Sequence, residues 1–279
     1  MKSLRIVRNV ASIVFLSVGI GAFAQEPQKA GVEENAKTRV VPVVDAHVHF
    51  MDTRPGDMDI LLKWMQENNV ERCINHELRQ MRAKDAAAKT QREENYRLVK
   101  GKVGRFTILF HDEVNSVDEA VTILEKEKKA GAIGFGEHYG EPFAGNAKGS
   151  EVFFDDPKNR VLFEACAKVG LPVMFHMDRG RNLDEKGLPR LENVLKAYPN
   201  CIFIAHSDWW KFLPDGTCER FLKTYPNLYA DLSCTVGRSA IGRDKNFARE
   251  FFIRNADKLL FGSDSGFWSL GKKPVPEFG

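Results

Sequence analysis

Eight short apolar segments recur along this chain, and helical patterns separate them. They are rich in Val, Ile and Phe and mostly continuous, which is typical of parallel strands covered on both faces. The segments are Val40–Ala46, Glu71–Asn75, Gly104–Phe110, Ala132–Gly136, Pro172–Phe175, Cys201–Ala205, Leu228–Leu232 and Lys258–Gly262. A strand followed by a helix, repeated eight times at a spacing of roughly 25 to 40 residues, predicts an α/β fold of the (β/α)8 (TIM) barrel type. A doubly wound open sheet is the alternative.

Helix signals fill the intervals between these segments. The capping box Ser116–Glu119 opens a helix that closes on Gly131, and Asp156-Pro157 opens another that ends at Gly170. Further amphipathic stretches predict helices over Met58–Asn68, Glu93–Lys100, Leu188–Tyr198, Cys218–Tyr225 and Asn246–Ala256. Only fifteen residues follow Asp264, and they are poor in helix formers, so we expect the final helix to be short or missing.

The first 24 residues have the pattern of a secretory signal peptide. Lys2, Arg5 and Arg8 precede the uncharged apolar run Val10–Ala22, and small residues then predict cleavage after Ala24. We therefore expect an exported protein, periplasmic or secreted. An uncleaved membrane anchor is the alternative, but the run is shorter than the about 20 residues that span a bilayer. We expect no stable membrane insertion after cleavage.

Removal of the signal peptide (residues 1–24) changes the charge balance. The full chain has 41 basic and 38 acidic residues, and the signal peptide holds three of the basic ones, so the mature chain is formally neutral. This argues against a nucleic-acid partner and favours a small-molecule substrate, with a homo-oligomer left open. Residues 25–38 are polar and predict a flexible lead-in, and residues 39–279 are expected to form the barrel domain. The five cysteines include no C-x-x-C pair, and we interpret them as structural.

Two histidines close the first predicted strand. Because strand side chains alternate, Asp45, His47 and His49 are expected to share the side that faces the barrel interior. Two imidazoles at a barrel mouth suit zinc, iron or manganese, and Asp45 could orient one of them from behind. Two surface histidines on an edge strand are the alternative.

Three further polar residues follow apolar runs. His176 ends PVMFH, His206 ends CIFIAH, and Asp264 follows the last predicted strand. Taken singly, the two histidines could be ordinary hydrogen-bonded residues and Asp264 a turn or N-cap residue. In a closed barrel, Asp264 would instead face the histidines of the first strand, where it could bind metal and take a proton from water.

This ordered set, D-x-H-x-H, two separate histidines and G-S-D, resembles the amidohydrolase superfamily, specifically its amidohydrolase-related (amidohydrolase 2) branch. The resemblance covers residues 40 to about 266. H-x-H alone is a weak signal, whereas the ordered set is specific. The resemblance implies His47, His49, His176 and Asp264 as metal ligands. It makes His206 either a ligand of a second metal or the residue that polarises the scissile group.

The fourth strand departs from the pattern of many amidohydrolases, which have a carboxylated Lys there that bridges two metals. Here the strand holds Glu137 and no Lys, and is similar to the G-E motif of TatD-type metal-dependent hydrolases, in which the Glu bridges two metals. Glu137 is therefore a candidate bridging ligand. A salt-bridged or substrate-binding Glu is the alternative, so one ion and two both stay open.

The resemblance implies hydrolysis of an amide, ester or lactone bond of a small molecule by metal-activated water, with zinc expected first and manganese or iron as alternatives. Asp264 would accept the proton of the water, and His206 or the metal would stabilise the oxyanion. Arg179, Tyr139 and Trp209 follow ligand positions and are candidate substrate contacts for a planar acid or an aryl ester, unless they only pack the loops.

Three other functions remain open from the sequence. The same branch of the superfamily contains non-oxidative decarboxylases, which are lyases that use one metal. The Glu137 motif also suggests phosphodiester hydrolysis, although the neutral mature chain argues against DNA. A non-catalytic metal-binding barrel is the third alternative, because the C-terminus is short.

Overall fold

All strands of the protein join one parallel sheet. The computed structural model describes residues 41–78, 81–110, 113–139, 154–177, 187–242 and 244–270. Its strands are β1 Val43–His49, β2 Val70–His76, β3 Val103–Thr107, β4 Ala132–Tyr139, β5 Val173–Met177, β6 Phe203–Ser207, β7 Leu228–Asp231, β8 Leu259–Leu260 and β9 Ser265–Gly266. Strands β1 to β8 pair with their neighbours in chain order, and β9 pairs with β1. Since β8 and β9 are successive parts of the eighth strand, the sheet closes, and the predicted barrel is confirmed.

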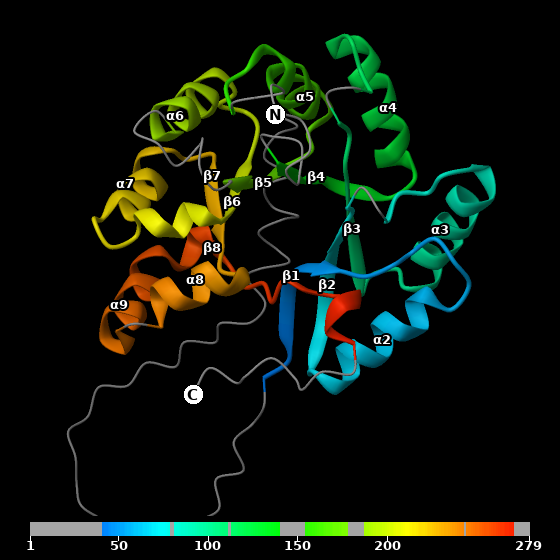
Figure 1. Ribbon diagram of the computed structural model, residues 1–279, viewed down its shortest axis with the longest axis horizontal. Helices are drawn as coiled ribbons and strands as arrows, with labels where there is room; N and C mark the ends of the chain where they lie inside the picture. The colour runs from blue at the N-terminus through cyan, green and yellow to red at the C-terminus, as the bar shows by residue number, and fades with distance from the viewer. Residues whose placement is uncertain are drawn as a thin grey trace, which may run out of the picture.

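Helices surround the strands, as Figure 1 shows. They are α2 Asp57–Glu67, α3 Ala86–Leu98, α4 Val117–Lys129, α5 Pro157–Val169, α6 Gly187–Ala197, α7 Thr217–Thr224, α8 Cys234–Ile241 and α9 Lys245–Asn255. Among the described residues, a single helix follows each of β1 to β5, and both α8 and α9 follow β7. Among the described residues, no helix has the length and apolar character needed to cross a membrane.

The predicted capping signals operate in the structure. The Ser116 side chain accepts a hydrogen bond from the Glu119 N–H at 3.2 Å, which satisfies a donor at the first turn of α4. Asp156 caps α5 in the same way, and Gly170 ends α5 in the left-handed region at φ 73°. Both helices therefore begin where the sequence predicts.

Two helices differ from the prediction. Helix α3 begins at Ala86 rather than near Glu93, because Asp85 accepts a hydrogen bond from the Ala88 N–H at 2.8 Å and caps an Ala-rich first turn. Helix α8 was not predicted. In the described part of the chain, only the 3₁₀ turn Phe267–Ser269 follows β9. The predicted signal peptide, the predicted lead-in and residues 271–279 lie outside the described residues, so the predictions for them remain untested.

The apolar residues form an outer layer and an inner plug. The largest buried cluster lies between the sheet and helices α4 to α9, and a second packs α2 and α3 against β1 and β2. Inside the barrel, six strands each contribute one residue to a plug: Ala46, Ile74, Phe106, Met174, Ile204 and Leu260. All five cysteines are buried and free, as the structural interpretation predicts. The plug supports the polar residues at the carboxyl ends of the strands.

Candidate metal centre

Six residues that the sequence singled out lie together at the carboxyl ends of the strands. They are His47, His49, Glu137, His176, His206 and Asp264. One carboxylate oxygen of Glu137 lies 3.5 Å from Nε2 of His49 and 3.7 Å from Nε2 of His47. Its other oxygen lies 3.3 Å from Nε2 of His206 and 3.8 Å from Nε2 of His176. Oδ1 of Asp264 lies 3.4 Å from Nε2 of His49.

Strand β1 reaches this arrangement through an irregularity. Its register with β2 shifts between Asp45 and Val48. Val48 then packs on the outside of the sheet against residues of α2, while His47 and His49 face the mouth of the barrel. The expectation that Asp45 would orient an imidazole is wrong. Oδ1 of Asp45 accepts hydrogen bonds from the main-chain N–H groups of His47 and Ser263, both at 3.0 Å. Asp45 thus joins β1 to the eighth strand, and burial raises its pKa to about 6.

The carboxylate behind His47 is Asp231, at the end of β7. Nδ1 of His47 donates to Oδ2 of Asp231 at 2.6 Å. The Ser233 hydroxyl donates to the same oxygen at 2.6 Å and accepts from Nδ1 of His206 at 2.9 Å. The indole of Trp210 fixes the backbone, because its Nε1 donates to the main-chain oxygen of Asp231 at 2.7 Å. Sequence reasoning missed Asp231 and Ser233, although Asp231 ends an apolar run much as Asp264 does.

Hydrogen bonds fix the tautomers of three imidazoles. Nδ1 of His49 donates to the main-chain oxygen of His76 at 3.0 Å, while His47 and His206 donate from Nδ1 to Asp231 and Ser233. In the neutral form of each ring, Nε2 therefore carries the lone pair. Nε2 of His47 and Nε2 of His49 lie only 2.9 Å apart. At this distance two lone pairs repel each other unless a proton or a metal ion lies between them, so the donor set fits a metal ion that takes the place of this proton.

Electrostatics favour ionised carboxylates at this place. Burial raises the pKa of Glu137, but the facing charge of His206 and the hydrogen bond from His47 outweigh it, and the pKa lies well below its ordinary value. The pKa of Asp231 is lowered for the same kind of reason, by His47 and His206. Burial also lowers the pKa of His47, but Asp231 and Glu137 hold it well above its usual value. The ionised carboxylates of Glu137 and Asp231 are therefore stabilised by a positive charge nearby, which a proton or a metal cation would supply.

Two groups of three ligand atoms have the spacing of a metal site. His47, His49 and Asp264 form one, and His47, Glu137 and His206 form the other, with the ligand atoms of each group within 4.8 Å of one another. The groups share His47. This arrangement accommodates both one ion and two.

A further histidine, His76, lies beside the centre at the end of β2. Its ring stacks on His47 with centroids 4.3 Å apart, and its Nε2 donates to the main-chain oxygen of Ala46 at 2.9 Å. Burial and the neighbouring charges of His47 and His49 lower its pKa well below the usual value. A neutral His76 therefore packs the wall of the site without adding charge to it.

The predicted substrate contacts fare differently. Trp209 is fully buried in the large apolar cluster, so the side chain exposes no surface to a substrate, and this prediction is wrong. The prediction rested on the position of Trp209 directly after β6, but the indole ring packs into the core. Arg179 lies outside the described residues, and so does the side chain of Tyr139, whose backbone ends β4.

A family model described as Amidohydrolase matches residues 44–277, which is most of the chain. The chain belongs to the amidohydrolase family. All six residues of the candidate centre lie inside the matched segment of this amidohydrolase. In sequence, no curated protein matches the chain significantly.

Solved structures share the amidohydrolase barrel. A probable 2-pyrone-4,6-dicarboxylic acid hydrolase from Acinetobacter baumannii is 16% identical over 79% of this chain and 83% of its own, with a TM-score of 0.52. An uncharacterised TIM-barrel protein from Bordetella bronchiseptica is 13% identical over 79% and 85%, with a TM-score of 0.55. Dihydroorotase from Campylobacter jejuni is 16% identical over 80% and 69%, with a TM-score of 0.50. At such identities the likeness shows the fold alone.

Proposed function

We propose that this amidohydrolase is a metal-dependent hydrolase that cleaves an amide, ester or lactone bond of a small molecule. The observation that supports it most is the convergence of the Nε2 atoms of His47, His49 and His206 on Glu137, with the Nδ1 atom of each ring facing an oxygen behind it. Two proteins that share the barrel are named a hydrolase and a dihydroorotase, which agrees with this reaction class.

The proposed ligands are the six residues around Glu137: His47, His49, Glu137, His176, His206 and Asp264. Imidazole and carboxylate donors suit zinc first, and manganese or iron as alternatives. When bound, such an ion would supply Lewis acidity, which lowers the pKa of a water molecule and polarises a carbonyl group. Glu137, nearly equidistant from several imidazoles, is the proposed bridge if two ions bind.

Asp264 is the proposed general base. Its side chain is 30% exposed, whereas that of Glu137 is 3% exposed, so Asp264 is the carboxylate that a water and a substrate can reach. Burial raises its pKa, but the hydrogen bond with His49 and the charges of the nearby imidazoles lower the pKa by more than burial raises it. The net effect keeps the carboxyl group of Asp264 ionised at neutral pH. An ionised Asp264 would accept a proton from the water and return it to the leaving group.

His206 is the proposed stabiliser of the developing negative charge if it does not bind a second metal ion. Its ring is held between Ser233 and Glu137, so its orientation is fixed before a substrate arrives. Arg179 and Tyr139 stay proposed substrate contacts, since both lie just after ligand positions in the sequence. An Arg there would pair with the carboxylate of an acidic substrate.

Metal content is the first test. The protein spanning residues 25–279 would be dialysed against metal-free buffer and assayed by elemental analysis. We expect one or two equivalents, lost in a His47→Ala/His49→Ala variant. Glu137→Gln should lower the metal content, and Glu125→Gln, the same change on the exposed face of α4, should not. A folded wild-type protein without metal would contradict the proposal.

The reaction type is tested separately in ¹⁸O-labelled water. Hydrolysis of amides, esters or lactones places one labelled oxygen in the acid product. Release of carbon dioxide from an aromatic acid, without such labelling, would instead identify a decarboxylase. Tight metal binding without turnover of any of these substrates would indicate a non-catalytic barrel.

A further inference from the structure

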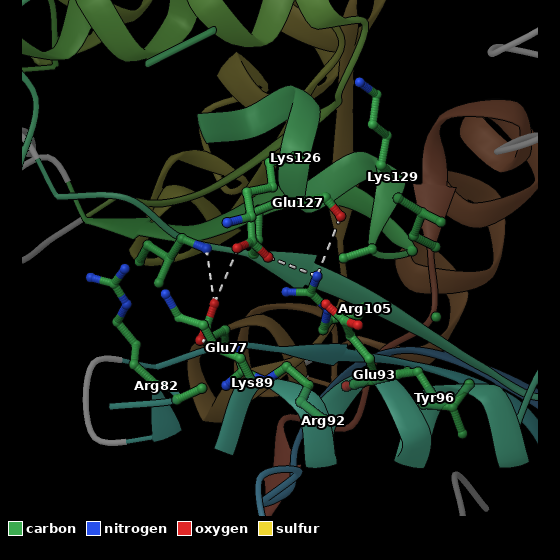
Figure 2. Close-up of a pocket in the computed structure, with 18 of the residues that line it drawn as sticks. Glu77, Arg82, Lys89, Arg92, Glu93, Tyr96, Arg105, Lys126, Glu127 and Lys129 are labelled. Carbon is green, nitrogen blue, oxygen red and sulfur yellow. Dashed lines mark hydrogen bonds and ion pairs between the residues drawn. The ribbon is translucent and has the colours of Figure 1, made fainter. Parts of the chain in front are cut away.

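A large groove lies on the outer wall of the barrel, between α3 and α4. Its volume is about 1000 Å³, which is the size of a small-molecule site. Strands β3 and β4 form its floor, and Figure 2 shows the two helices on either side. Ile133 of β4 is 38% exposed there, although outward residues of barrel strands are normally covered by helices. The described residues that line it include none of the six proposed metal ligands.

Arg105 occupies the middle of this groove and is only 2% exposed. Its Nη2 donates to Oε2 of Glu127 at 2.9 Å, and its guanidinium lies 5.8 Å from the ring centroid of Tyr96. Nη1 is buried and has no hydrogen-bond partner. Figure 2 shows Arg105 between the two helices, among the residues that line the groove. A buried cationic donor without an acceptor costs free energy, so an acceptor oxygen of a ligand at this point would stabilise the protein.

The charges around the groove favour an anion. The acidic residues Glu77, Glu113 and Glu127 each pair with an arginine of the lining. Four lysines of the lining have no ion-pair partner within the described part of the chain: Lys89, Lys100, Lys126 and Lys129. Glu93 is the one lining acid left to balance them among the residues described. The groove therefore has a local excess of positive charge, which attracts anions.

The wall of the groove is preformed by polar contacts. Helix α3 buries Arg92 and Asn95 rather than an apolar face. Arg92 pairs with Asp52 at 3.0 Å and with Glu77 at 2.7 Å, and Asn95 donates to the main-chain oxygen of Asp52 at 2.9 Å. These bonds hold α3 against β1 and β2, away from α4, so the groove does not depend on a ligand to keep it open.

We propose that this groove is a second ligand site, which takes a small organic anion with a carboxylate or phosphate-type group. The charged group accepts a hydrogen bond from Nη1 of Arg105 and lies near Lys126 and Lys129, and the apolar part of the ligand packs on Ile123 and Ile133. The site is independent of the proposed hydrolysis, because it lies outside the barrel wall.

Phenylphosphonate is a suitable probe, since its C–P bond resists hydrolysis. Titration calorimetry on the metal-loaded protein should show binding, and the neutral analogue benzyl alcohol should not bind. Benzoate in parallel distinguishes a carboxylate ligand from a phosphate-type one. Because phosphonates also bind metals, the titration is repeated on His47→Ala/His49→Ala, where the groove site should persist. Arg105→Met should weaken binding by about tenfold or more, the usual effect of losing one charge-assisted hydrogen bond.

Lysine labelling locates the bound probe. Phenylphosphonate should protect Lys126 and Lys129 from reductive methylation, while Lys63 on α2, remote from the groove, should react unchanged. If Arg105→Met fails to fold, the exposed double variant Lys126→Glu/Lys129→Glu serves instead and should weaken binding severalfold. The proposal is overturned if no probe binds at 10 mM (about the weak limit of useful affinity), if binding vanishes with the metal centre, or if it survives both groove variants unchanged.

Discussion

Each imidazole of the proposed centre has two ring nitrogens, and the structure gives them different partners. The Nδ1 atoms of His47, His49 and His206 face oxygens of the protein, so their Nε2 atoms face the centre. The carboxylate of Asp231 is the strongest of these acceptors, because it is buried, ionised and 2.6 Å from His47. Metal affinity should therefore depend on residues that touch no metal.

The first prediction concerns Asp231→Asn. Loss of the negative charge behind His47 should make Nε2 a poorer donor and weaken metal affinity by about 10- to 100-fold. Competition with a chromogenic chelator measures this affinity. Asp257→Asn, the same substitution at an exposed site, is the control and should change nothing. Equal affinities for both variants would show that Asp231 has only a packing role.

The second prediction concerns Asp264→Asn. If Asp264 moves the proton, kcat should fall by about 10² to 10⁴, while most of the metal stays bound because five other ligands remain. Elemental analysis and turnover are measured on the same preparation. Full activity would contradict the assigned role, and so would a loss of activity that merely follows the loss of metal.

Sequence reasoning found the residues that follow apolar runs and missed those that act through them. His47, His49, His176, His206 and Asp264 were found because each ends a strand-like run. Ser233 has no such signal, since a single hydroxyl in a polar loop is common. The role assigned to Asp45 failed because a register shift in β1 breaks the assumed alternation, and no residue type marks that shift in advance.

At the scale of the elements, strand β4 depends on a glycine. Gly136 has φ +133°, and a Cβ there would lie 2.4 Å from the main-chain oxygen of Met174 on β5. Strands were predictable from their apolar runs, but this close approach depends on the neighbouring strand and was not. The close packing of β4 against β5 thus determines the backbone conformation just before Glu137.

The third prediction compares two glycines. Gly101→Ala should cost about 1 kcal/mol, because its φ is +85° but nothing lies within 4 Å. Gly136→Ala combines an unfavourable φ with a clash against backbone and should cost about 3 kcal/mol or more. Urea unfolding of both variants measures the difference. Similar costs would mean that β4 and β5 can move apart freely.

Helices α7 and α9 are joined by an ion pair that titrates. Glu219 accepts hydrogen bonds from Arg254 at 2.9 Å and Lys223 at 2.7 Å, and these lower its pKa from 4.5 to about 2. A lowered carboxyl pKa means that the folded state favours the ionised form. Its contribution to stability is therefore complete above about pH 5 and is lost as the pH falls towards 2.

The fourth prediction follows from this sign. Glu219→Gln should lower the free energy of unfolding at pH 7 by up to about 1 kcal/mol, as expected for a pair near the surface. At pH 3 the difference from wild type should shrink. Urea unfolding at both pH values measures it, with Glu125→Gln as the control. A difference that is independent of pH would show that Glu219 acts by packing alone.

Helix predictions failed where tertiary contacts replace an apolar pattern. Helix α3 buries polar side chains, so its amphipathic signal is weak over the first turns. Helix α8 contains Gly237, where a Cβ would lie 3.0 Å from the main-chain oxygen of Leu232, and small residues there allow the helix to pack closely. Neither feature follows from periodicity alone.

At the scale of the whole molecule, five thiols report on the integrity of the barrel. All five are buried and free, and burial raises the pKa of Cys73, Cys166, Cys201, Cys218 and Cys234. The fifth prediction is that a thiol-specific chromogenic reagent reacts slowly with the native protein and titrates five thiols in denaturant. Fewer than five thiols in denaturant would reveal a disulfide, which contradicts the structure.

The proposed centre joins opposite ends of the barrel domain. His47 pairs with Asp231, 184 positions away, and Asp45 of the first strand binds Ser263 of the last, 218 positions away. A nascent chain still emerging from the ribosome, or one cut inside the barrel, holds two neighbouring histidines but not the partners that aim them. The protein should therefore bind the proposed metal only after the last strand has joined the sheet, and the proposed reaction should require the closed barrel.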